Sequence, residues 1–150
     1  MNMFSIQWGA TPEFNLNCFF TFLNSSVILD SQTQGVIELT IVEFFEYIHK
    51  ETDTIGGVHL GLENQQLTLV FESGISGKEE RKNFIEKLEI SLSEELFYIY
   101  SLVDYMSLNK VEGTVLMRFN LSYLSTDRYL ERARLMKAYF HTTTIQVLEV

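Results

Sequence analysis

Few side chains in this sequence have the types and spacing that catalysis or metal binding requires. Three histidines, His49, His59 and His141, stand apart along the chain, and none has a second histidine or a cysteine close by, as a local metal site would need. The single cysteine, Cys18, alternates with apolar residues, so it is expected in the core rather than as a reactive nucleophile. The sequence therefore predicts no metal site and no nucleophilic thiol.

The segment from Gly74 to Lys78 shares its glycines and its lysine with phosphate-binding loops. A Walker loop needs a hydroxyl residue after the lysine, but here Glu79 and Glu80 follow, and their charge would repel a phosphate. Adjacent carboxylates on a helix diverge by about 100° and cannot share a substrate proton. We therefore expect no catalytic residue, no cofactor and no enzymatic activity.

The elements that must position any site fit into one domain. A chain of 150 residues with 46% hydrophobic residues is large enough for one core, so residues 1–150 are expected to form a single domain. One cysteine is typical of a reducing compartment, and the cytoplasm is the expected location. No run reaches the roughly 18 apolar residues of a membrane span, so no membrane partner is predicted.

Residues near the N-terminus alternate between apolar and polar types. Phe4, Ile6 and Trp8 predict a first strand, and Pro12, the only proline, is expected in the connection after it. Apolar residues at every even position from 14 to 22, followed by an Asn-Ser-Ser turn signal, predict a β-hairpin over 14–29.

A capping signal and a second alternating segment follow. Thr40 and Glu43 match the S/T-x-x-E capping box, which predicts a helix over 41–50 that ends between Thr52 and Gly57. Apolar residues then alternate on both sides of an Asn-Gln pair, so residues 58–71 are predicted to form a second hairpin.

The second half of the chain is predicted to be mostly helical. Residues 73–77 break the pattern, and a helix is expected to begin near Lys78. Ser91 begins another capping box, so the helical region that continues through Met106 could be one helix or two. Alternation then predicts a strand over 114–123.

The C-terminal residues complete the predicted fold. Apolar residues at helical spacing over 129–140 predict an amphipathic helix, and β-branched residues over 142–150 predict a last strand. The order of elements indicates an α+β fold, with a mostly antiparallel sheet built from hairpins and with helices packed on one face.

Charge is distributed unevenly along the chain. The net charge is −9, and residues 1–77 hold nine acidic residues and one basic residue, which accounts for −8 of it. If these acids lie together, their field would speed encounter with a cationic partner. The predicted C-terminal helix is basic, but the overall negative charge opposes binding to nucleic acid, and no nucleic-acid partner is expected. Its cations are Arg128, Arg132, Arg134 and Lys137.

The N-terminal third of the chain resembles a family of bacterial proteins. The segments FSIQW, CFFTFLNSSVIL and TIVEFFEYI are similar in layout to immunity proteins of contact-dependent inhibition and polymorphic toxin systems. The resemblance implies a small, acidic α+β protein of the cytosol that lacks an active site. It also implies that the protein neutralises a cognate toxin domain, commonly a basic nuclease, by covering its active site or substrate surface.

The candidate partner-binding residues are the acids with the highest charge density, around the first predicted helix and the hairpin after it. They are Glu43, Glu46, Glu51, Asp53, Glu63 and Glu72. An alternative function is a regulatory domain that binds a small ligand, since twelve Phe and seven Tyr residues could line an apolar pocket. The sequence leaves the identity of the partner and the oligomeric state open.

Overall fold

The computed structural model describes residues 2–7, 12–26, 31–54, 56–121 and 134. In these residues the fold is α+β, as predicted, and a five-stranded sheet has the order β1-β2-β3-β5-β4 with every neighbouring pair antiparallel. The elements are β1 (Asn2–Gln7), α1 (Pro12–Ser26), α2 (Ser31–Thr52), β2 (Gly57–Glu63), β3 (Gln66–Glu72), α3 (Lys78–Ser91), α4 (Phe97–Leu102), β4 (Tyr105–Asn109) and β5 (Thr114–Asn120).

The hairpin of β2 and β3 confirms the prediction for residues 58–71. Its strands pair from Gly57 opposite Glu72 to Glu63 opposite Gln66. The two turn residues, Asn64 and Gln65, have φ angles of 51° and 60°, as the tight turns that suit twisted antiparallel strands require.

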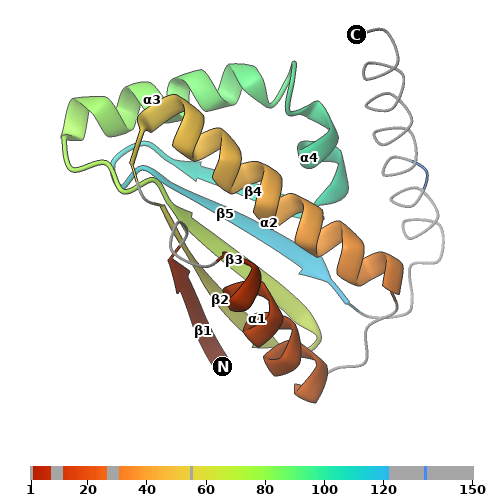
Figure 1. Cartoon of the computed structure of the whole chain (residues 1–150). Helices are drawn as coiled ribbons and strands as arrows, with labels where there is room; N and C mark the ends of the chain where they lie inside the picture. Colours follow the sequence, from red (N-terminus) through yellow and green to blue (C-terminus); the bar gives the residue numbers. More distant parts are fainter. Residues whose placement is uncertain (1, 8–11, 27–30, 55, 122–133, 135–150) are drawn as a thin grey trace, which may run out of the picture.

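One face of the sheet carries the core. Side chains on β2, β3 and β5 alternate between buried and partly exposed, and the buried ones face the helices. Phe71 of β3 lies at the centre of this layer, with its ring 4.7 Å from that of Phe44 and 5.6 Å from that of Phe45, both on α2. Figure 1 shows α1 and α2 on the same side of the sheet.

The hairpin predicted over 14–29 is wrong, because residues 12–26 form helix α1. Phe19, Phe20 and Leu23 are buried, at the i, i+1 and i+4 spacing of a helical stripe. Pro12 is the first residue of the helix rather than part of the connection, at a position where its missing N–H costs no hydrogen bond. Cys18 is only partly buried.

Helix α2 starts ten residues before the start predicted from the capping box. Thr40 lies inside the helix, where its buried hydroxyl donates to the Val36 carbonyl oxygen at 2.8 Å, so it does not cap an N-terminus. Val36 and Ile37 are also buried, and they extend the apolar stripe toward the N-terminal end. The predicted end holds, since α2 stops at Thr52.

The helical region after Lys78 consists of two helices, which settles the alternative left open by the sequence. The second capping box does not form, because the Ser91 hydroxyl donates to the Glu95 carboxylate and the N-cap of α4 is Leu96. The predicted extension through Met106 is wrong. Residues 105–109 form β4, which pairs with β5.

The start of β1 and the strand β5 confirm two further predictions. Trp8, the helix predicted over 129–140 (Arg134 apart) and the strand predicted over 142–150 lie outside the described residues, as do residues 27–29 of the predicted hairpin.

Candidate functional site

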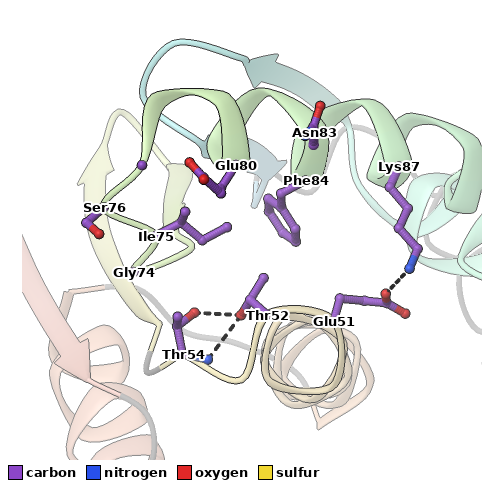
Figure 2. A pocket seen from close by; sticks show the side chains of 11 residues that line it. Glu51, Thr52, Thr54, Gly74, Ile75, Ser76, Glu80, Asn83, Phe84 and Lys87 are labelled. Atoms are coloured by element: carbon purple, nitrogen blue, oxygen red, sulfur yellow. Dashed lines mark hydrogen bonds and ion pairs between the residues drawn. The ribbon is translucent and has the colours of Figure 1, made fainter.

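A cleft of about 630 Å³ opens between the end of α2, the loop from Ser73 to Gly77 and the first half of α3. Figure 2 shows polar side chains from all three segments around it. Ile75 and Phe84 supply its apolar part, and carboxylate, hydroxyl, amide and ammonium groups supply the rest. It therefore offers both an apolar surface and charged hydrogen-bonding groups to a ligand.

The connection after α2 holds one wall of the cleft. Asp53 follows the helix with φ of 52°, a conformation that Asp tolerates better than most residues. The N–H of Thr54 then donates to the Thr52 hydroxyl oxygen at 3.2 Å, and the Thr54 hydroxyl donates to the Ser73 carbonyl oxygen at 2.5 Å. These bonds tie the end of α2 to the loop that follows β3, so these two sides of the cleft are held together.

The other wall is one face of α3. Glu80, Asn83 and Lys87 occupy i, i+3 and i+7, and therefore point to the same side of the helix together with Phe84. Lys87 forms an ion pair with Glu51 across the cleft, and the hydrogen bond that Lys87 donates to the Glu51 carboxylate raises the pKa of Lys87. The Glu51 side chain is only 13% exposed, whereas that of Lys87 is 63% exposed. The Glu80 side chain is exposed as well. A partner could therefore bind the Glu80 carboxylate without displacing Lys87 from Glu51.

A chain of hydrogen bonds runs beside the cleft between α2 and α3. The Tyr47 hydroxyl lies 3.1 Å from the Ser91 hydroxyl, which donates to the Glu95 carboxylate at 3.1 Å. Tyr47 is 6% exposed, and its burial raises the pKa of its hydroxyl above the usual value of 10.0. The fold therefore favours the neutral phenol.

We expect Tyr47→Phe to lower the free energy of unfolding by about 1 kcal/mol at neutral pH, since one hydrogen bond is lost. Above pH of about 10 the unfolded chain ionises this tyrosine before the folded chain does, so the natural protein loses stability as the pH rises. Lys87, with its raised pKa, adds a loss of the same sign in both proteins. Urea unfolding between pH 8 and pH 11 should show a shallower decline for the variant, and parallel declines would contradict the assignment.

Of the predicted acids, Glu72 lies at the same end of the sheet as the cleft, with its carboxylate on the face opposite the helices, and two others lie at the cleft or next to it. Glu51 lines it, and Asp53 stands exposed between the two lining threonines. Glu72 precedes the loop and accepts a hydrogen bond from His59 Nε2 at 3.0 Å. A Cβ on Gly56 would lie 2.9 Å from the Glu72 carbonyl oxygen, so the end of β3 packs against the connection that holds Asp53.

The other three predicted acids are placed elsewhere. Glu46 is exposed on α2, one to two turns before the cleft. Glu43 accepts a hydrogen bond from the Tyr98 hydroxyl at 3.1 Å and so faces α4. Glu63 is at the turn end of the β2–β3 hairpin, opposite Gln66, while Glu72 is at the other end. At about 3.4 Å per residue these two ends are roughly 20 Å apart, so the six acids do not form one surface.

Sequence reasoning missed the residues that α3 contributes. The sequence presents Glu80 only as a charge that would repel a phosphate, and it gives no role to Asn83 or Lys87. A signal was present in their spacing, since 80, 83, 84 and 87 fall on one helix face. That spacing shows that the four residues share a face of the helix. It does not show that α2 lies opposite this face and forms a cleft with it.

Within the described residues, no group of three or more His, Cys, Asp or Glu side chains could hold a metal ion. No helix in that part of the chain has the length and apolar character needed to cross a bilayer.

Comparisons with known proteins add no family to this geometry. No protein-family model matches the chain, and no curated protein matches it in sequence. The function is therefore inferred from the cleft and its surrounding charges.

Proposed function

We propose that this protein is a protein-binding module that captures a basic partner through the acidic end of the molecule, around the cleft. The observation that supports this most directly is the convergence of Glu51 and Glu80 in the cleft, with Asp53 exposed beside it and Glu72 exposed at the same end of the sheet. These acids come from three segments of the chain, α2 with its exit connection, β3 and α3, and only the fold brings them together.

The cleft suits a lysine or arginine side chain of the partner. The methylene stem of such a residue would pack against Ile75 and Phe84, and its charged head would reach the Glu80 carboxylate. Lys87 already satisfies Glu51, so Glu80 and the acids at the rim supply the remaining attraction. Complementary charge mainly raises the association rate and selects against acidic partners.

The partner class that we propose is a toxin domain in the cytoplasm, and the protein would be its immunity protein. This is what the resemblance of the N-terminal third implies. An acidic surface would stand in for the phosphates of a nuclease substrate, and rapid capture matters because a toxin must be bound before it reaches its substrate.

Affinity capture from a lysate of the source cell, followed by mass spectrometry, tests the proposal. We expect a basic protein to be retained at about 50 mM salt and released at about 500 mM, because salt screens exposed charges. Retention that does not depend on salt, or an acidic partner, would contradict the acidic-surface mechanism.

A second step separates a toxin from any other basic partner. The captured protein is expressed alone and together with this chain in a laboratory bacterium. We expect growth arrest in the first case and restored growth in the second. A partner that does not arrest growth when expressed alone would contradict the immunity function, but it would remain consistent with a protein-binding module.

A further inference from the structure

Strand β4 is an outer strand with little protection against pairing. Within the described residues its ladder partner is β5 alone, on one side. Natural proteins guard such edges with charged residues, proline or bulges, but the sequence of β4, Tyr-Met-Ser-Leu-Asn, contains neither charge nor proline. Among the described residues, nothing occupies its outer edge, which can accept another strand.

An apolar groove of about 380 Å³ lies beside this edge, on the helix side of the sheet. Met106 and Leu108 of β4 form its floor, and their ladder partners, Met117 and Val115, belong to the buried face. Phe97 and Tyr100 of α4 also line the groove and are 55% and 53% exposed. A strand added to β4 would place every second side chain over this groove.

We propose that β4 pairs antiparallel with β4 of a second copy of this chain, about a two-fold axis at Ser107. The pattern of the strand is self-complementary. Met106 of each copy would lie opposite Leu108 of the other, on the groove side of the sheet, and Ser107 would lie opposite Ser107. Each strand would thus extend the apolar floor of its partner, next to the exposed rings of Phe97 and Tyr100.

The charge distribution permits two copies to meet at this edge. Most of the negative charge lies in residues 1–77, and β4 is separated from β2 by β3 and β5, which is about 14 Å at the usual strand spacing. Among the residues that the structure describes, Glu89 is the only acidic one that lines the groove. Of the nearby cations, Arg118 stacks on the Tyr105 ring at 5.1 Å, and Lys110 lies 3.9 Å from Glu86.

A two-fold interface also closes on itself. Pairing of β4 with the other outer strand, β1, would instead repeat without end. The self-complementary pattern of β4 favours the closed dimer, and this interface is independent of the cleft and of its proposed partner.

Opposite charges at Ser107 test the register. Ser107→Lys and Ser107→Asp each place two like charges at the axis, and we expect each to raise the dimer dissociation constant at least about tenfold. A mixture of the two variants should form a heterodimer, because Lys then faces Asp. Sedimentation velocity and native mass spectrometry measure the oligomeric state of the two variants and of their mixture, and circular dichroism checks that each variant is folded. Ser25→Lys, at an exposed position of α1, is the control variant and should remain dimeric.

Three results would overturn the proposal. One is a natural chain that stays monomeric up to about 1 mM, a concentration that reveals even weak pairing. Another is dimers that persist unchanged in both Ser107 variants, which would place the interface elsewhere. The third is open-ended growth, which would indicate pairing of β4 with β1.

Discussion

Phe71→Ala should lower the free energy of unfolding by about 3–5 kcal/mol, because it leaves a cavity at the centre of the core. The ring is 1% exposed and lies within 6 Å of the rings of Phe44 and Phe45, both of which are equally buried. A domain of this size is stable by roughly 5–15 kcal/mol, so the loss is a large part of the total. Urea unfolding followed by circular dichroism measures it.

The neighbouring residue on the same strand supplies the control. Val70 faces the opposite side of the sheet and is only partly buried, so Val70→Ala should cost about 1 kcal/mol. Phe71→Leu should fall between the two, since it removes less volume. Equal losses for Phe71→Ala and Val70→Ala would contradict the placement of Phe71 against α2.

The spacing of apolar residues predicted correctly those elements whose pattern fits only a strand or only a helix. The β2–β3 hairpin and β5 carry an apolar residue at every second position over seven residues each, and α3 follows a clear break. α1 allows two interpretations, because its apolar residues fall at every even position and, at Phe19 and Leu23, at helical spacing as well. A short apolar run does not distinguish these periods, and the fold decides by burying Phe19, Phe20 and Leu23.

Two other misassignments have local causes. The Thr40–Glu43 capping box is a correct sequence match inside a longer helix, where the threonine hydroxyl bonds to the preceding turn instead. β4 was assigned to a helix because Val103 and Met106 continue the i, i+3 spacing of α4, although Met106 and Leu108 also alternate as strand residues do. Pairing with β5 selects the strand, and that pairing is not visible in local sequence.

The candidate site was predicted in part. Clustering the acids by chain position includes Glu51, which lines the cleft, Asp53, which is next to it, and Glu72, which is at the same end of the sheet. The hairpin predicted from the sequence already separates Glu63 from Glu72, since they occupy opposite ends of paired strands. The contact of Glu43 with Tyr98 depends on how α4 packs against α2, and so it could not be predicted.

The double variant Glu72→Lys/Glu80→Lys should weaken binding to a basic partner about 100-fold at low salt. Both carboxylates are exposed, that of Glu80 in the cleft and that of Glu72 at the same end of the sheet, and each reversal replaces an attraction with a repulsion, which we expect to cost about tenfold. The two effects should add if the sites are independent. Asp53 is left unchanged, because its φ of 52° suits Asp better than Lys. Titration calorimetry with the captured partner, at low and high salt, measures the loss, which should shrink as salt rises.

Glu63→Lys/Glu94→Lys is the matched control, because it changes the net charge by the same amount at positions away from the cleft. Glu63 is at the far end of the hairpin, and Glu94 lies seven residues beyond Lys87, the last cleft residue on α3, which is about 10 Å at 1.5 Å per residue. If binding depends on net charge alone, the two double variants will weaken it equally. If the cleft is the binding site, the control will retain most of the affinity, since its charges lie about one Debye length or more from the cleft, and that length is about 10 Å at 0.1 M salt. Equal losses of affinity in the two double variants would therefore contradict the cleft as the binding site, but they would still support attraction by the overall negative charge.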